Sequence, residues 1–450
     1  MIRKMILLVL ATTCLTGISN KAFGTSEPNI GQARAAVKTL ITSGKLIEAA
    51  DAYQKLLKDF SNNAQISAAV FDIAETYRNT SKFEQSLVSY KDVLENWPQS
   101  SEAMRAQSGI VISDIALNKL DDANDELVKL KTDYATDPNI AQMVFNVGDA
   151  YYWFKKYSDS NEVYKYVIGT YPKSEFAMWA TMGLAISCIA GKDEVSADNY
   201  IAKLSADYAE SGKLAEAFVY VAGRYEYARS YEKAGILYQH IADEFPQSTQ
   251  ARNIPFELAK INVLEIIESE SEKAIEIIDN FTYDFNSRSD LPGVLLTPVS
   301  ERLYVKAFVM DGNNLKEQAK LYFQKAAGLW ELLEQKDPNL AHTADGYNWA
   351  GYCYLKLSQY QKAIDCFDSA LQKYPKNSLT WHTLIMLAKC YEDFKKAGGI
   401  ANEEADVKIK EAYQKISGDF PKCKAAGIAI SWLEENGIIT NTNSFITGSN

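Results

Sequence analysis

The sequence is poor in the residue types on which most catalytic and metal sites depend. It contains three histidines in 450 residues, His240, His342 and His382, and none stands at ligand spacing from another histidine, a cysteine or a carboxylate. It also lacks the glycine motifs that build nucleophile elbows, phosphate loops and dinucleotide sites. With 58 acidic residues, no chosen pair of carboxylates indicates a glycosidase. We therefore expect no enzyme activity, no cofactor and no metal ion.

Cysteine is scarce as well. Beyond the N-terminal segment there are five, an odd number without any CxxC pair: Cys188, Cys353, Cys366, Cys390 and Cys423. This spacing fits neither a disulfide framework nor a zinc site. The sequence predicts that these cysteines are small core residues.

Runs of basic residues are missing. The chain has 47 Lys and Arg against 58 Asp and Glu, which gives a net charge of −11. Because phosphate backbones and anionic lipids attract clustered positive charge, nucleic acid and anionic membrane surfaces are not expected partners.

A long apolar run lies at the N-terminus. Arg3 and Lys4 precede the apolar residues 5–18, and Ala22-Phe23-Gly24 supplies small residues for cleavage. This order of features predicts a signal peptide over residues 1–24. The fourteen apolar residues are fewer than the ~20 that cross a bilayer, so we expect no transmembrane span in the mature chain.

A lipid anchor on Cys14 is the alternative interpretation of the same segment. Cys14 follows Leu10-Ala11-Thr12-Thr13, in which Ala11 stands at the usual leucine position. The match is poor, and cleavage before Thr25 is the preferred prediction.

What the sequence has in abundance is a repeat. An aromatic residue returns every 37 residues from Phe60 onward, at Phe60, Trp97, Tyr134, Tyr171, Tyr208 and Phe245. Proline follows it at Pro98, Pro172 and Pro246. Two residues further stands a side chain that can cap a helix, at Ser100, Ser174, Ser248 and, after Pro375, Asn377. Proline ends one helix and the polar residue starts another, which predicts a series of helical pairs.

The segment Tyr347–Pro375 fixes the type of repeat. It has Gly351, Tyr354, Ala363, Phe367, Ala370 and Pro375 at the spacing of a tetratricopeptide repeat, which it closely resembles. Tyr347 fills the usual tryptophan position with another aromatic ring. The resemblance implies an all-α solenoid of about ten helix–turn–helix repeats in a right-handed superhelix, closed by a C-terminal capping helix.

The 37-residue step and the aromatic-Pro-x-Ser junction resemble one subclass of these repeats. It includes the lipoprotein of the outer-membrane β-barrel assembly machinery and the periplasmic Tol-Pal accessory protein of bacteria. The resemblance covers about residues 29–283 and 340–421. It implies an exported protein, either periplasmic or associated with the outer membrane.

Departures from the repeat divide the chain. Residues 284–299 contain Pro292, Gly293 and Pro298 and are predicted to be a loop between two arrays, 25–283 and 300–436. The second array includes a capping helix over Lys424–Glu435, and 437–450 is a polar tail.

Three repeats show smaller departures from the pattern. Repeat three places Asp114 where other repeats have tyrosine. In repeat seven, Pro255 interrupts the first helix or confines it to a later start. Repeat ten has an insertion around residues 396–407, which is expected to lengthen its turn.

One stripe on the first helix of each pair is expected to line the concave face. Its residues give an aromatic, mildly acidic groove: Phe71, Phe145, Asp149, Tyr152, Trp153, Trp179, Met182, Tyr304, Phe308 and Tyr352. We predict that Tyr152, Trp153, Trp179 and Met182 lie side by side. The alternative is that the aromatic residues pack between repeats.

The preferred function is a scaffold whose groove holds an extended or helical segment of another protein, an envelope protein by the resemblance above. Acidic neighbours such as Asp149 suggest a basic partner. One alternative is a carbohydrate-binding or carbohydrate-processing protein that stacks sugars on Trp153 and Trp179. Another is a self-associating structural array.

Overall fold

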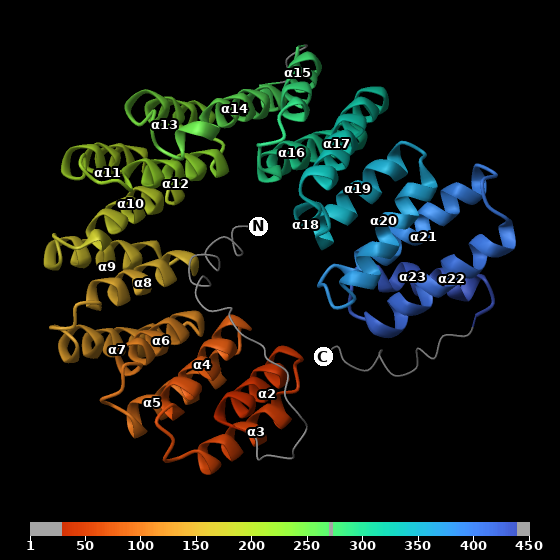
Figure 1. Ribbon diagram of the computed structural model, residues 1–450. Coiled ribbons are helices and arrows are strands. Elements are labelled where there is room, and N and C mark those ends of the chain that lie inside the picture. The colour runs from red at the N-terminus through yellow and green to blue at the C-terminus, as the bar shows by residue number, and fades with distance from the viewer. Residues whose placement is uncertain (1–28, 270–272, 439–450) are drawn as a thin grey trace, which may run out of the picture. The chain divides into compact units, whose positions relative to one another are not determined.

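The secondary structure is helical, as predicted, throughout the residues that the computed structural model describes, 29–269 and 273–438 (Figure 1). The predicted signal peptide, the new N-terminus at Thr25 and nearly all of the predicted tail lie outside these residues. The chain divides into two compact units between Ser187 and Cys188. This boundary falls inside helix α10 (Glu175–Ala190).

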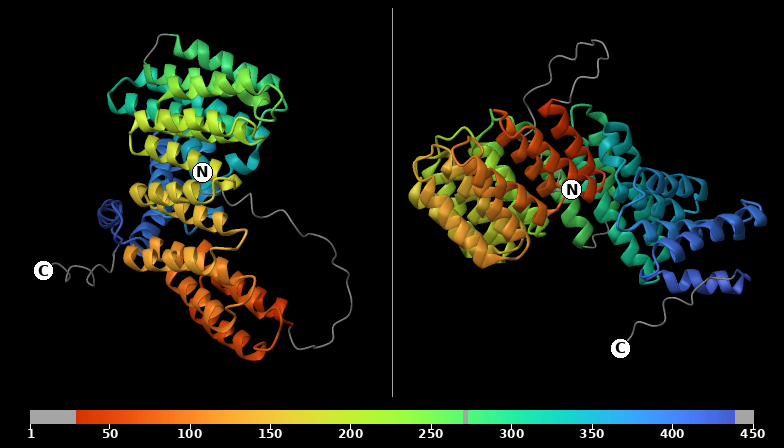
Figure 2. Two further views of the ribbon diagram at one scale, coloured as in Figure 1. Left: turned by 90° about the vertical axis from the view of Figure 1, so that its left-hand side faces the viewer. Right: turned by 90° about the horizontal axis from the view of Figure 1, so that it is seen from below.

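The first unit consists of antiparallel helical hairpins that follow one another along the stack (Figure 2). The first helix of one hairpin packs on the first helix of the next, as α2 does on α4 and α6 on α8. The hairpins are α2 (Ile30–Thr42) with α3 (Leu46–Asp59), α4 (Ile66–Asn79) with α5 (Phe83–Asn96), α6 (Ala103–Ala116) with α7 (Leu120–Asp133), and α8 (Ile140–Trp153) with α9 (Tyr157–Thr170).

A left-handed residue turns the chain within each of these hairpins. Gly44, Ser81, Asn118 and Lys155 have φ values of 77°, 61°, 59° and 61°, at steps of 37 residues. The amide after the turn reaches back five residues: the N–H of Lys156 donates to the carbonyl oxygen of Tyr151 at 2.8 Å. This is the Schellman arrangement, which satisfies carbonyl groups left open at a helix end. The turn within each hairpin therefore recurs with the same 37-residue step as the aromatic residue.

The aromatic residue of the 37-residue step stands at the end of the second helix. Tyr171, for example, is the C-cap of α9. The predicted capping side chains then accept from a nearby amide, Ser174 Oγ from Phe176 at 3.2 Å and Asn377 Oδ1 from Leu379 at 2.8 Å. Ser100 differs, because its buried hydroxyl has no hydrogen-bond partner among the described residues.

The second unit continues with hairpins of more varied length. Its α-helices are α11 (Glu194–Asp207), α12 (Leu214–Tyr227), α13 (Tyr231–Glu244), α14 (Ile254–Ser269), α15 (Ala274–Ser287), α16 (Leu296–Gly312), α17 (Lys316–Lys336), α18 (Pro338–Ala341), α19 (Ala344–Lys356), α20 (Tyr360–Lys373), α21 (Thr380–Lys396), α22 (Asn402–Asp419) and α23 (Ala426–Glu435). Two 3₁₀ turns, η2 (Ala251–Asn253) and η3 (Gly293–Leu295), precede α14 and α16. The last helix, α23, packs on α22 at the position predicted for the capping helix.

The predicted loop 284–299 is wrong at both ends. Helix α15 continues to Ser287, and α16 begins at Leu296. Pro298 is tolerated there because amides in the first turn of a helix have no helical acceptor. For the same reason Pro255 is the second residue of α14. Because α14 contacts α16 and α15 contacts α17, the stack runs through this segment without a break.

The insertion in repeat ten lengthens its helices more than its turn. Helix α21 runs to Lys396 and α22 begins at Asn402, so the turn between them is residues 397–401. Gly398 supplies the left-handed residue of this turn, with a φ of 72°.

Candidate functional site

The residues of the predicted stripe separate into core residues and surface residues. Phe71 belongs to the core, since 5% of its surface is exposed. Its ring lies 5.8 Å from that of Tyr90, and the guanidinium of Arg105 stands 4.2 Å from its centre. Phe71 therefore does not line a groove.

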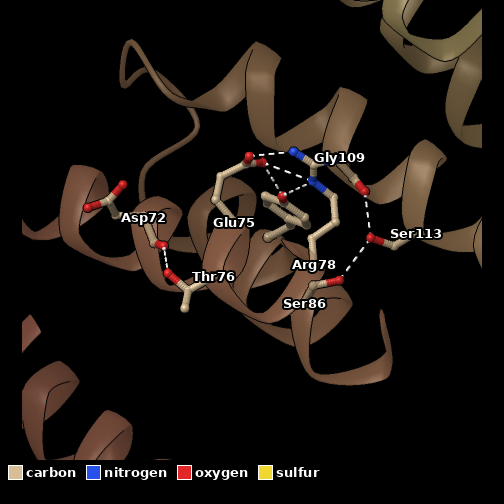
Figure 3. A network of polar contacts seen from close by, with 8 residues as sticks. Asp72, Glu75, Thr76, Arg78, Ser86, Gly109 and Ser113 are labelled. Carbon is tan, nitrogen blue, oxygen red and sulfur yellow. Dashed lines mark hydrogen bonds and ion pairs between the residues drawn. The ribbon is translucent and has the colours of Figure 1, made fainter. Parts of the chain in front are cut away.

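A polar network beside Phe71 shows why the acidic spots of the stripe are not open. Tyr90 of α5 donates to Glu75 of α4, and the Nε of Arg78 donates to the phenol oxygen of Tyr90 at 3.2 Å (Figure 3). Arg78 and Glu75 form an ion pair at 2.5 Å. A Cβ atom at Gly109 would come within 2.4 Å of the Tyr90 ring, so glycine allows α6 to cover this network.

The same arrangement returns 74 residues later, between α8, α9 and α10. Phe145 packs at 5.7 Å from the rings of both Tyr164 and Phe176. Asp149 accepts the hydroxyl hydrogen of Tyr164 at 2.6 Å. Desolvation raises the pKa of Asp149 to about 7, although the bond from Tyr164 acts in the opposite direction. Asp149 is partly exposed, and its carboxyl group is engaged by Tyr164.

Trp153 is the exposed part of the stripe in the first unit. It lies at the end of α8 with 42% of its surface exposed, and its ring contacts Tyr152 edge-on at 5.6 Å. Trp179 and Met182 of α10 are half-buried. In the part of the chain that the structure describes, no ring contact joins Trp153 to Trp179. That these four residues lie side by side stays a prediction.

In the second unit, by contrast, the structure brings three predicted residues together. Tyr304 and Phe308 of α16 face Tyr352 of α19, with ring centres 5.6 and 5.7 Å from it. Trp349 stacks on Tyr304 at 6.3 Å. Trp349 was missed from the sequence, although it stands three residues before Tyr352 and therefore on the same side of the helix. Tyr304, Phe308, Trp349 and Tyr352 are called the aromatic surface below.

The aromatic surface is apolar, partly open to solvent, and bordered by a neutral pair. Phe308 is 50% exposed and Val309 beside it 51%. Lys356 binds Asp311 at 2.5 Å, and its ammonium lies 5.3 Å from the centre of the Tyr352 ring. Because these two charges satisfy each other, the surface favours an apolar side chain over a charged one.

Other kinds of chemistry find little support in the described residues. They contain no group of three or more His, Cys, Asp and Glu side chains that could hold a metal ion. The five cysteines there are unpaired, and burial raises the pKa of Cys390 to about 12, which keeps that thiol protonated and unreactive. None of the described helices is both long enough and apolar enough to cross a membrane.

Comparison with known proteins agrees with this architecture. Residues 344–377 match the tetratricopeptide repeat family. No curated protein matches the chain. The chain consists of stacked helical hairpins with a left-handed residue in the turn, and in several of them an aromatic ring of the second helix packs against a glycine of a first helix. This architecture is that of a helical-repeat solenoid. The family match at α19 and α20 makes the chain a tetratricopeptide repeat protein, and the repeat type is that of an interaction scaffold.

Several solved structures are similar at low sequence identity. A tetratricopeptide repeat protein from Parabacteroides merdae is 14% identical, with 68% of this chain and 96% of that chain covered and a TM-score of 0.32. The human IFIT1 dimer with m7Gppp-AAAA is 15% identical over 92% and 90%, with a TM-score of 0.42. The C-terminal part of a repeat protein from Cytophaga hutchinsonii is 14% identical over 64% and 99%, with a TM-score of 0.36.

Proposed function

We propose that this protein is an exported scaffold that binds a segment of another protein on the aromatic surface of α16 and α19. The observation that carries the proposal is Phe308, which stays half exposed while its neighbours Tyr304 and Tyr352 hold it from two helices. An exposed apolar patch on a folded domain usually marks a contact surface.

The ring contacts also favour tight binding. Tyr352 is held from three sides by Tyr304, Phe308 and Phe323, the last at 5.9 Å. Rings fixed in this way lose little further freedom when a partner arrives, so less of the binding free energy is spent on ordering them. Aromatic side chains in such positions commonly dominate binding.

The chemistry of the surface describes the partner. With Lys356 and Asp311 paired at its border, the surface offers no unpaired charge at its centre. The partner segment therefore inserts an aliphatic or aromatic side chain between α16 and α19. An amphipathic helix or an extended segment with one apolar anchor meets this requirement.

Export and an envelope role form the finer part of the proposal. They are supported by the basic start, the apolar run and the small residues that end at Gly24. The 37-residue step adds the resemblance to repeat proteins of the bacterial envelope. The bound segment then belongs to a periplasmic or outer-membrane protein.

Quantitative affinity capture tests the binding proposal. The mature protein, its Phe308→Ala variant and its Ile236→Ala variant are immobilised and exposed to an envelope extract of the source cells. Ile236 is the matched control, because it is 61% exposed on α13 of the same unit. The captured amount of at least one protein should fall tenfold or more with Phe308→Ala and stay unchanged with Ile236→Ala. A capture profile that is identical for all three proteins contradicts the proposal.

The two alternative functions are separated by simple measurements on the same sample. Binding to a glycan array that is lost with Trp153→Ala would favour carbohydrate recognition. A concentration-dependent sedimentation coefficient would favour self-association. The proposed scaffold shows neither.

A further inference from the structure

The cavity between α5 and α7 in the first unit has a buried carboxylate at its base. Its volume is about 500 Å³, and its walls include Leu87 of α5 and Val128 of α7. The base is Asp114 of α6, which is 4% exposed. This cavity lies outside the aromatic surface, which belongs to the second unit.

Asp114 stands where other repeats have a tyrosine that makes a hydrogen bond. The hydroxyl of Tyr151 donates to Asn124 at 3.0 Å, and that of Tyr354 donates to Glu331 at 2.8 Å. Each bond reaches a side chain of the preceding second helix. Asp114 is too short to do this, and no hydrogen bond or ion pair joins its carboxylate to another described residue. Asp114 is 4% exposed, but its carboxylate oxygens are not among the fully buried atoms that lack a partner, so a donor from outside can reach them.

A second cavity provides an internal comparison. It lies one repeat further along, between α7 and α9, has a volume of about 490 Å³, and is lined by Tyr151. The two cavities are therefore alike in size and in position within the repeat. What distinguishes the first is the chemistry at its base, an unpartnered carboxylate in place of a phenol that is already bonded.

The charges around the first cavity leave it negative. Glu126 is occupied, because it accepts from Gln107 at 2.7 Å and from Lys129 at 2.8 Å. The remaining charged groups on the walls are Asp114, Asp122, Asp125, Lys91 and Lys119, three negative and two positive. Lys91 and Lys119 are exposed, and neither reaches ion-pair distance of Asp114. Desolvation raises the pKa of the Asp114 carboxyl, while Lys119 lowers it.

We propose that this cavity binds a primary ammonium group on an aliphatic stem, as in a lysine side chain. The ammonium donates to the Asp114 carboxylate, and the stem lies along Leu87 and Val128. This hydrogen bond is charge-assisted. In the repeats of Tyr151 and Tyr354 the tyrosine at this position is already hydrogen-bonded within the protein, so it offers no such acceptor. Its source is either a lysine of a partner protein or a small free amine.

Ligand-observed NMR titration of the mature protein tests the proposal with three probes. They are n-butylamine, N-acetyl-lysine methylamide, and N-acetyl-norleucine methylamide as the uncharged match. At least one amine should bind saturably and at least tenfold more tightly than the norleucine probe. Binding of the lysine probe alone identifies a protein lysine, and equal binding of butylamine identifies a free amine. No saturable binding, or equal binding of the norleucine probe, overturns the proposal.

Two substitutions that each remove one negative charge locate the site. Asp114→Asn should weaken amine binding at least tenfold, whereas Asp122→Asn at the exposed mouth should weaken it less than threefold. Equal effects of the two overturn the proposal. Asp114→Tyr restores the residue type of the other repeats, so it should fold and bind no amine. A folded Asp114→Tyr protein that keeps full amine affinity overturns the proposal even if Asp114→Asn fails to fold.

Discussion

Tyr164 donates its hydroxyl hydrogen to Oδ1 of Asp149 across 2.6 Å, and this bond ties α9 to α8. The ring of Tyr164 lies between two glycines, since a Cβ atom would come within 2.7 Å of it at Gly148 and 2.6 Å at Gly183. Tyrosine and carboxylate are thus enclosed together. The enclosure raises the pKa of Asp149 to about 7, from an ordinary value of 3.8.

This raised pKa predicts that stability falls as the pH rises. The folded protein holds the Asp149 proton up to about pH 7, while the unfolded chain loses it near pH 4, so stability from this group is lost across that window. The shift corresponds to an upper limit of roughly 4 kcal/mol. Asp149→Asn keeps an acceptor for Tyr164 but has no titration. Denaturant unfolding measures the free energy of unfolding at pH 5 and at pH 8. Its decrease between these pH values should be smaller in the variant than in the original protein. An equal decrease would show that Asp149 is not the titrating group.

Two helical glycines, Gly351 at a helix contact and Gly223 at an exposed position, predict opposite effects of the same substitution. At Gly351, an added Cβ atom would come within 2.7 Å of the Phe367 ring, whereas at Gly223 nothing lies within 4 Å. Gly351→Ala should therefore destabilise the second unit by about 1–3 kcal/mol. Gly223→Ala lies on an exposed helix position and should stabilise it by roughly 0.5–1 kcal/mol. Chemical denaturation measures the change in the free energy of unfolding of both variants. Two changes of the same sign would contradict the described packing of Gly351 against Phe367.

Replacing the buried Lys260 should reduce stability by an amount that depends on pH. Lys260 is 5% exposed and binds Glu226 at 2.7 Å and Glu257 at 2.5 Å. Lys260→Met leaves two carboxylates without their cation, which should cost about 3–5 kcal/mol at pH 7. Burial raises the pKa of Glu226, so this carboxyl group takes up a proton more readily as the pH falls, and the loss of stability should shrink at pH 5.

Lys362→Met is the control for this prediction. Lys362 is exposed and pairs with Glu331 at 2.8 Å, so its removal should cost at most about 1 kcal/mol at either pH. A Lys260→Met protein no less stable than this control would show that the buried cluster does not act as described.

The N-terminal segment predicts the mass of the mature protein. Cleavage after Gly24 leaves Thr25, or a residue within a few of it, as the first residue. Intact-mass spectrometry of the exported protein measures this directly. A mass that begins at Cys14 and includes a diacylglycerol group would instead establish the lipid anchor.

The repeated elements of the fold could be read from the sequence because they are local. The aromatic residue at each helix end and the capping residue after it depend on neighbours a few positions away. Gly351 likewise meets its partner, Phe367, within one hairpin. Hence the all-α fold, the repeat and the capping helix were predictable. The loop at 284–299 was placed wrongly because Pro298 breaks a helix interior but suits a first turn.

Site residues were harder to predict because their exposure depends on the next repeat. Phe71 and Asp149 have the spacing of groove residues, yet Tyr90 and Tyr164 cover them, and Gly109 and Gly183 let those rings approach. Tyr304, Phe308 and Tyr352 come together on neighbouring first helices, as their spacing indicates. Trp349 was missed because the predicted stripe included only Tyr352 on this helix. The exposure of Phe308 is a property of the assembled helices.

Site-specific photocrosslinking in the source cells tests the central claim most directly. A benzoylphenylalanine residue is placed at Phe308 or Val309 on the aromatic surface, or at Ile236 or Val407 as exposed controls on second helices. The account predicts the same protein adduct from positions 308 and 309 and its absence from positions 236 and 407. Adducts that form equally at the control positions, or that are missing at both 308 and 309, would contradict it.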